Sequence, residues 1–192
     1  DHYWYPGLGY GGSCFPKDVH EIAQYSRSVG FGNNLFNSLH ALNTTRILQR
    51  LNRYEEKIGG WKGKNVAVLG LSFKRNTDDL RDAPSLSIIP RLLEAGAIVK
   101  GFDPKAQYKP DTNVPNSEQY QQVKTIDEFE DSIDVLLILI EWDEIVSYAY
   151  EKLRSTKNVQ WIIDTRNVLD PIVVKKHGFK YLATGRPLQE SL

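Results

Sequence analysis

Hydrophobic residues between positions 17 and 58 recur with the spacing of an α-helix. A first apolar face ends just before Gly30, and a second, formed mainly by leucines within 35–51, ends before Gly59. Because glycine commonly follows the last residue of a helix, the pattern predicts two helices in this region. Residues 1–16 show neither the helical nor the strand period and are rich in glycine and aromatic side chains, so we expect an ordered loop there.

From residue 61 onward the pattern changes, and short apolar runs alternate with amphipathic segments. We expect strands at 65–70, 97–102, 135–140, 160–164 and, at the edge of the sheet, 180–183. We expect helices at 85–94, 142–155 and 171–176, and a polar surface segment at 105–122. Such alternation predicts an α/β fold with a mostly parallel sheet covered by helices, preceded by the helical region that ends near residue 60.

Composition argues against a protein that binds nucleic acid and against one that spans a membrane. The 192 residues carry 24 Lys and Arg against 24 Asp and Glu, and this balance is not typical of a protein that binds nucleic acid. The longest apolar run is too short to span a membrane. A single free cysteine suits a reducing compartment, so we expect a cytoplasmic protein. The chain begins at Asp1 and contains no methionine, which indicates a fragment of a longer protein.

Cys14 is the chain's only cysteine and its most informative chemical group. It cannot form an internal disulfide or a multi-cysteine metal site, and the four histidines show no metal-ligand spacing, so we expect no metal. Two glycines precede Cys14, and Lys17 and Asp18 follow it at the expected helix start, where a thiolate nucleophile is favoured. The alternative is a small buried side chain. Asp18 also begins a capping-box pattern with Glu21, so capping the helix is an alternative or additional role for it.

Residues 7–12 match the G-x-G-x-x-G dinucleotide fingerprint, but no apolar strand precedes them, as that fingerprint requires. We expect instead a loop whose backbone amides approach a ligand closely. The first strand of the α/β region ends at Gly70 without the other fingerprint glycines. A nucleotide could still bind at the carboxyl ends of the strands, where Lys74 and Arg81 are candidate phosphate contacts. Their alternative role is solvated surface charge.

Several motifs, in order along nearly the whole chain, resemble those of the UDP-glucose 6-dehydrogenases, within the UDP-glucose/GDP-mannose dehydrogenase superfamily. The motifs are GYGGSCFPKD (9–18), VLGLSFK (68–74), TDDLRDAP (77–84), FDP (102–104), EW (141–142), DTRN (164–167) and GR (185–186). The resemblance implies two Rossmann-like domains joined by a long helix, the first binding NAD and the second the UDP part of the substrate. It implies that residues 1–60 are the catalytic-cysteine loop and central dimerisation helices of a homodimer. Residues 61–192 would be the Rossmann-like UDP-sugar-binding domain. The N-terminal NAD-binding domain would be missing, so the isolated chain would be inactive.

The resemblance also implies a reaction and its site residues. The family oxidises UDP-glucose to UDP-glucuronate with two NAD, through a thiohemiacetal and a thioester on the cysteine, here Cys14. Asp18 would help activate the hydrolytic water, and Lys17 and Arg81 would lie near NAD. The residues that match the family's substrate contacts are Tyr3, Trp4, Tyr5, Pro6, Gly7, Gly11, Phe73, Lys74 and Arg166. Core packing remains an alternative role for Phe73, and a surface salt bridge for Arg166.

The choice of sugar stays open at this point. Trp4 and Tyr5 are bulky for the substrate loop, and Ile140 and Thr165 also depart from the family pattern. A related nucleotide-sugar dehydrogenase, acting on GDP-mannose or another UDP-sugar, is therefore an alternative. So is a non-catalytic fragment that binds a nucleotide or forms a dimer. The family's common use is the supply of precursors for polysaccharide biosynthesis.

Overall fold

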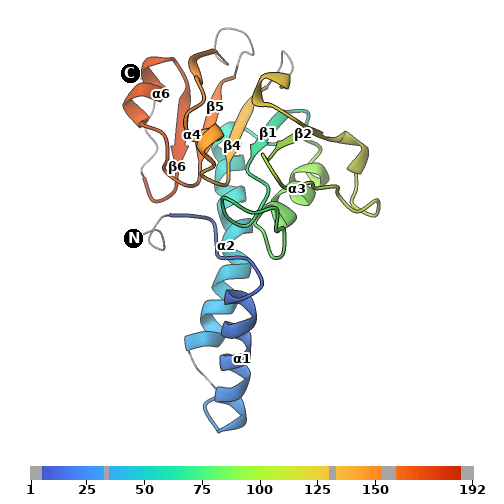
Figure 1. Cartoon of the computed structure of the whole chain (residues 1–192), viewed down its shortest axis with the longest axis vertical. Coiled ribbons are helices and arrows are strands. Elements are labelled where there is room, and N and C mark those ends of the chain that lie inside the picture. The colour runs from blue at the N-terminus through green and yellow to red at the C-terminus, as the bar shows by residue number, and fades with distance from the viewer. Residues whose placement is uncertain (1–5, 33–34, 130–132, 153–158, 187–192) are drawn as a thin grey trace.

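A helical hairpin projects from an α/β unit in the computed structural model, which describes residues 6–32, 35–129, 133–152 and 159–186. The hairpin consists of α1 (Phe15–Ser28) and α2 (Leu35–Ile58), which lie side by side in Figure 1. The C-terminal half of α2 belongs to the α/β unit, because Leu51, Tyr54 and Ile58 are buried in its hydrophobic core. Helix α2 therefore connects the projecting hairpin rigidly to the sheet.

The α/β unit is built on a six-stranded sheet in which every pair of neighbouring strands is parallel. The strands are β1 (Asn65–Leu69), β2 (Ile98–Phe102), β3 (Tyr120–Val123), β4 (Val135–Ile138), β5 (Trp161–Asp164) and β6 (Lys180–Ala183). Their order across the sheet is β3-β2-β1-β4-β5-β6, which is the doubly wound order of a Rossmann fold. The strand order reverses between β1 and β4, so this fold would bind a ligand beyond the carboxyl ends of those strands.

Burial shows that both faces of the sheet are covered. Every residue of β4 is buried, and successive side chains of a strand point to opposite faces. Helix α3 (Ser85–Glu94) buries Ile88, Ile89, Leu92 and Leu93 at helical spacing. Shorter helical segments follow later strands: α4 (Asp143–Val146), α6 (Pro171–Lys176) and two 3-10 turns, Ser117–Gln119 and Ile126–Glu128. The α/β fold expected from the sequence is therefore confirmed.

Most expected elements occur, and their ends differ from the predictions by at most two residues. The bounds predicted for α3, α6 and β6 agree with the structure, and β6 is an edge strand. The sequence predicted a polar surface segment over 105–122 with no strand in it, but its residues from Tyr120 onward begin strand β3. That prediction was wrong because β3 is a polar strand, Tyr-Gln-Gln-Val, which pairs only with β2 and so lies at the other edge of the sheet.

Two helix predictions also needed correction. The helix expected at 142–155 is interrupted: α4 ends at Val146, residues 147–150 are not helical, and helical backbone is described again at 151–152. Two side-chain hydroxyls donate hydrogen bonds to backbone carbonyls of α4 where it ends. Ser147 Oγ donates to Asp143 O at 2.7 Å, and the Tyr150 hydroxyl donates to Ile145 O at 2.6 Å. At the other end of the chain, α1 begins at Phe15, two residues earlier than expected, because Pro16 fits the first turn of a helix.

Candidate functional site

The glycine loop, residues 7–12, crosses the carboxyl edge of the sheet and leads into Cys14. Two of its glycines contact the segment between β1 and α3. The Gly12 amide donates to Arg81 O at 2.8 Å, and Gly12 has a φ of +82°. A Cβ on Gly12 would lie 2.7 Å from the Phe73 ring, and a Cβ on Gly11 would overlap the Asp82 carbonyl. These glycines therefore allow the loop to approach the protein's own backbone and an aromatic ring.

The other end of the loop touches two further elements. A Cβ on Gly7 would lie 2.6 Å from Nη1 of Arg166, which follows β5, and a Cβ on Gly9 would lie 2.7 Å from Oδ1 of Asn43 in α2. Asn43 also forms two hydrogen bonds with the backbone of Tyr10, at 2.9 and 3.0 Å. The loop is thus held between α2, the β1–α3 segment and the residues after β5.

Cys14 lies at the N-terminus of α1, as its N-cap residue, with an exposed and unpaired thiol. Its carbonyl accepts the Asp18 amide at 2.8 Å, which is the first hydrogen bond of the helix. In the described residues, its sulfur lies 3.8 Å from Oγ of the neighbouring Ser13, a long hydrogen bond. The alternative of a small buried side chain is therefore wrong, and the thiol is accessible to a reagent or substrate.

Two exposed cations lie within electrostatic range of Cys14. Hydrogen bonding to Asp18 raises the pKa of Lys17, with further contributions from the charge of Glu21 and, to a smaller extent, from Cys14. Hydrogen bonding to Asp79 raises the pKa of Arg81, and the Cys14 thiolate again contributes. The fold therefore brings together Cys14, Lys17 and Arg81, which the sequence analysis selected from separate segments.

The Arg81 guanidinium is held by Asp79. Arg81 donates from Nε at 3.0 Å and from Nη2 at 2.7 Å to the two carboxylate oxygens, and its backbone amide donates at 2.9 Å. These bonds lower the pKa of Asp79 to about 2, the side-chain hydrogen bond being the largest cause. Sequence reasoning did not select Asp79, although an acidic residue two positions before an arginine is the signal that could have identified it.

Asp18 does not cap α1, so the capping-box prediction was wrong. It is the fourth residue of the helix, because Phe15 begins the helix, and its amide is bonded to Cys14. Its carboxylate is exposed and lies 3.2 Å from Lys17 Nζ. Asp18 therefore presents its carboxylate one helical turn from the thiol.

Phe73 and Lys74 lie in the segment that follows β1. Phe73 is half-buried against Gly12, and its amide donates to Asp79 O at 3.0 Å. Lys74 is exposed, and its Nζ lies 5.2 Å from the centroid of the Phe73 ring. Both residues are therefore beside the glycine loop at the carboxyl edge of β1.

Asp103, directly after β2, holds this segment in place. Its carboxylate is 5% exposed and accepts hydrogen bonds from the amides of Leu71, Ser72, Lys105 and Ala106, the Ser72 hydroxyl and the Trp142 indole. In dinucleotide-binding Rossmann domains an acidic residue in this region binds the ribose hydroxyls. Here donors of the protein itself are bonded to the carboxylate, so Asp103 holds the segments after β1 and β2 in place at the edge of the sheet. The sequence signal was an aspartate immediately after a strand, but only its donors reveal the role.

Arg166 and Glu141 form an ion pair between the segments after β5 and β4. Arg166 Nε lies 2.7 Å from Glu141 Oε2, and the two side chains are 18% and 21% exposed. The Arg166 amide also donates to Asp164 Oδ1 at 3.0 Å. The pair is therefore partly buried at the carboxyl edge, beside Gly7, and is less exposed than an ordinary surface salt bridge.

The remaining predicted residues are only partly placed. Pro6 is half-buried at the start of the described chain, whereas Tyr3, Trp4 and Tyr5 lie outside the described residues. No group of three or more His, Cys, Asp or Glu side chains within the described ranges could hold a metal ion. In those same ranges, every helix is too short or too polar to cross a membrane.

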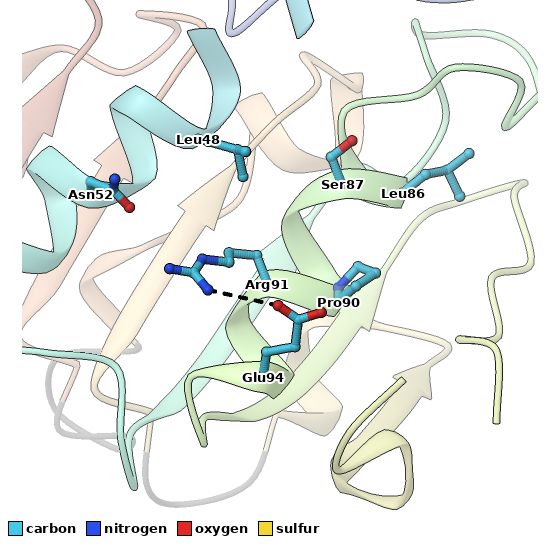
Figure 2. Close-up of a pocket in the computed structure, with 7 residues that line it drawn as sticks. All are labelled: Leu48, Asn52, Leu86, Ser87, Pro90, Arg91 and Glu94. Carbon is cyan, nitrogen blue, oxygen red and sulfur yellow. Dashed lines mark ion pairs between the residues drawn. The ribbon is translucent and has the colours of Figure 1, made fainter. Parts of the chain in front are cut away.

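A surface groove of about 360 Å³ lies elsewhere, between α2 and α3 (Figure 2). It is lined by Leu48, Asn52, Leu86, Ser87, Pro90, Arg91 and Glu94. Arg91 Nη1 lies 3.7 Å from Glu94 Oε2, the ion pair drawn as a dashed line in Figure 2. The groove contains none of the predicted site residues, so it is separate from the arrangement around Cys14.

Comparison with known families agrees with this geometry. Residues 67–171 match the UDP-glucose/GDP-mannose dehydrogenase family, UDP binding domain, and residues 1–45 match the central domain of the same family. The chain belongs to the UDP-glucose/GDP-mannose dehydrogenase family. The two matched regions divide the chain at about the point where α2 enters the α/β unit.

Curated relatives in this family are UDP-glucose 6-dehydrogenases. The chain is 34% identical to UDP-glucose 6-dehydrogenase TuaD of Bacillus subtilis, covering 94% of this chain and 39% of the relative. It is 35% identical to a UDP-glucose 6-dehydrogenase of Rhizobium meliloti, covering 94% of this chain and 41% of the relative. The chain therefore spans about two-fifths of the length of these relatives.

Solved structures in the family share the fold. A UDP-glucose dehydrogenase from Pyrobaculum islandicum is 31% identical with a TM-score of 0.72, covering 87% of this chain and 37% of that one. An NDP-N-acetyl-D-galactosaminuronic acid dehydrogenase from Methanosarcina mazei is 25% identical with a TM-score of 0.79, covering 95% and 39%. The arrangement of α1, α2 and the parallel sheet is thus a family architecture.

Proposed function

We propose that this chain is the C-terminal portion of a UDP-glucose 6-dehydrogenase, an oxidoreductase that converts UDP-glucose to UDP-glucuronate in two NAD-dependent oxidations. The observation that carries the proposal is the exposed thiol of Cys14, beside Lys17 and Arg81 at the carboxyl edge of a Rossmann-like sheet. Family membership and the identity to UDP-glucose 6-dehydrogenases support the same reaction.

The nucleotide sugar would bind along the carboxyl edge. Lys74 and Arg166 supply positive charge for the diphosphate, and the Phe73 ring offers an apolar surface to the base. Gly7 and Gly11 are loop positions without side chains, next to Arg166 and Asp82. Pro6 and the aromatic residues Tyr3, Trp4 and Tyr5 would complete the pocket around the sugar.

NAD would be held chiefly by the N-terminal domain, which lies outside this chain. The β1–α3 segment does not fit a dinucleotide, because it lacks the fingerprint glycines and Asp103 is fully occupied. Lys17 and Arg81 do fit contact with its phosphates, since both are exposed cations beside Cys14. When bound, NAD accepts the hydride from C6 in each of the two oxidations.

Cys14 would act as the nucleophile. Its sulfur attacks the aldehyde carbon C6, the carbonyl electron pair moves to oxygen, and that oxygen takes a proton to give a thiohemiacetal. Oxidation at C6 leaves a thioester, and water then attacks its carbonyl carbon. The carbon–sulfur bond breaks, releasing the thiolate and the carboxylate of UDP-glucuronate. Asp18, one helical turn from the thiol, would take the proton from the attacking water.

The proposal includes a division into two parts and a homodimer. Residues 1–60 would carry the nucleophile and dimerise, and residues 61–192 would bind the UDP-sugar. The exposed apolar residues of α2, Leu35, Leu39 and Leu42, share one face at spacings of four and three residues. Leu35 is 75% exposed and Leu42 61%, so a second copy would cover an otherwise unfavourable surface. The exposed free thiol suits a cytoplasmic location.

Isothermal titration calorimetry of the chain with UDP-glucose tests the binding part of this proposal. We expect millimolar to sub-millimolar affinity, competition by UDP, and no NADH formation until the NAD-binding domain is supplied. GDP-mannose and UDP-N-acetylmannosamine in the same experiment separate this function from related nucleotide-sugar dehydrogenases. Absence of any UDP-glucose binding at millimolar ligand by the folded chain would contradict the proposal.

A further inference from the structure

Cys14 has no side-chain partner that fixes its sulfur firmly, so the backbone before it must set its position. Among the described residues, its sulfur forms one long hydrogen bond, with Oγ of the neighbouring Ser13 at 3.8 Å. Tyr10, four residues before Cys14, is bonded to Asn43 of α2. The Tyr10 amide donates to Asn43 Oδ1 at 2.9 Å, and Asn43 Nδ2 donates to the Tyr10 carbonyl at 3.0 Å. A side-chain amide thus pairs with both polar groups of one backbone residue.

The contact leaves no room for a side chain in the loop. A Cβ on Gly9 would lie 2.7 Å from Asn43 Oδ1 and 3.6 Å from the Asn43 carbonyl. Because a real Cβ essentially never approaches an atom within 3.0 Å, a side chain at position 9 would displace either the loop or the Asn43 amide that bonds to Tyr10. Gly9 and Asn43 therefore form a matched pair, one supplying the space and the other the two hydrogen bonds.

Through α2, Asn43 connects the loop to the hydrophobic core around the sheet. One turn further along α2, Ile47 is buried, and Leu51, Tyr54 and Ile58 continue into the core that holds the strands. A second attachment, the bond from Gly12 N to Arg81 O at 2.8 Å, ties the loop to the β1–α3 segment. The loop is thus attached at Tyr10 and again at Gly12, two residues before Cys14.

We propose that Asn43 is a positioning residue, which through its paired hydrogen bonds to Tyr10 holds the glycine loop so that the Cys14 thiol lies next to the β1–α3 segment that carries Arg81. The inference deepens the proposed function, since it says how the nucleophile is placed. Its test needs neither substrate nor NAD. The positioning role of Asn43 can therefore fail while the proposed function stands, and the proposed function can fail while the positioning role stands.

The experiment measures alkylation of Cys14, the single cysteine, by neutral iodoacetamide and by anionic iodoacetate across a pH series. The ratio of the two rates reports the positive charge near the sulfur, and the pH midpoint reports its thiolate. We expect Asn43→Ala to reduce the iodoacetate-to-iodoacetamide ratio at least about threefold. Asn52→Ala, an exposed asparagine on the same helix, serves as the matched control and should leave the ratio unchanged.

The Gly9→Ala variant disturbs the same contact from the side of the loop. It replaces Asn43→Ala in the experiment if Asn43→Ala does not fold. We expect it to lower the ratio as Asn43→Ala does, and the double variant Gly9→Ala/Asn43→Ala to be no worse than Asn43→Ala alone, because the clash has gone. A merely structural role would lower the melting temperature and leave the ratio unchanged. That result in folded variants, or additive losses in the double variant, would overturn the proposal.

Discussion

Arg166 Nε lies 2.7 Å from Glu141 Oε2, and this pair joins the segments that follow neighbouring strands β5 and β4. Gly7 approaches the same guanidinium from the glycine loop. A charge that is partly buried and tied to a carboxylate has a defined direction, unlike a solvated surface arginine. Glu141 therefore determines where Arg166 can present its remaining N–H groups.

The Glu141→Gln substitution should weaken UDP-glucose binding while leaving the fold intact. A neutral amide cannot balance the charge of Arg166, so the guanidinium loses its charge-assisted hydrogen bond and its fixed orientation. We expect the dissociation constant to rise about tenfold, measured by calorimetry. Glu94→Gln, which breaks the exposed pair with Arg91 at 3.7 Å, is the control and should leave the affinity unchanged. Equal affinities for the two variants would show that Glu141 does not orient a binding residue.

Replacement of Asp103 by asparagine should destabilise the whole α/β unit. An amide at this position turns one acceptor oxygen into an NH₂ group that faces the N–H donors now bonded to the carboxylate. We expect the free energy of unfolding to fall by about 2–4 kcal/mol, measured by urea denaturation. Asp143→Asn, at an exposed carboxylate 3.6 Å from Arg75, should change it by less than about 0.5 kcal/mol. A similar small loss at both sites would contradict the role assigned to Asp103.

Two glycine substitutions separate backbone strain from steric overlap. Gly12 and Gly59 have similar φ angles, +82° and +79°, but a Cβ on Gly59 meets nothing within 4 Å. Gly59→Ala should therefore cost about 1 kcal/mol of stability, from backbone strain alone. Gly12→Ala should cost at least about 1 kcal/mol more, because its Cβ also meets the Phe73 ring. Thermal unfolding of both variants measures this difference, and a Gly12 variant as stable as the Gly59 variant would disprove the close packing of the loop.

The Asp79–Arg81 pair predicts a specific acid titration. Arg81 lowers the pKa of Asp79 from 3.8 to about 2, so the folded state holds this carboxylate ionised more strongly than the unfolded state does. The pair's contribution to stability is therefore present above about pH 4 and is lost as the pH falls toward 2. A ¹³C NMR titration of the Asp79 carboxyl should give a midpoint near 2, and Arg81→Ala should return it toward 3.8. An unchanged midpoint in that variant would mean that Arg81 is not the cause.

The sequence predicted the elements whose signals are local. Helix α3 has four apolar residues at strict helical spacing, and α6 begins after Asp170, whose side chain accepts the Ile172 amide at 2.8 Å. Strand β3 was missed because its residues are polar and it pairs on one side only. The helix expected at 142–155 was wrong over 147–150, because the bonds of Ser147 and Tyr150 to nearby carbonyls do not appear in a hydrophobic pattern.

The candidate site likewise contains residues that the sequence predicted and residues that it did not. The family motifs selected Cys14, Lys17, Arg81 and Arg166 as site residues, and the fold places them along one edge of the sheet. Two of the residues that hold them, Asn43 and Glu141, were not selected, because each acts on a partner 25 or more positions away in the sequence. Such contacts depend on the tertiary fold and leave no spacing that a sequence pattern could reveal.

Protection of Cys14 by substrate tests the central claim, that the thiol borders the nucleotide-sugar site. The rate of iodoacetamide alkylation is measured with increasing UDP-glucose, at concentrations that calorimetry has shown to saturate the chain. We predict that the rate falls at least about threefold, with the same concentration dependence as binding, and that Arg166→Ala shifts the effect to higher UDP-glucose. An alkylation rate that stays constant while UDP-glucose saturates the protein would place the thiol away from the bound sugar and contradict this account.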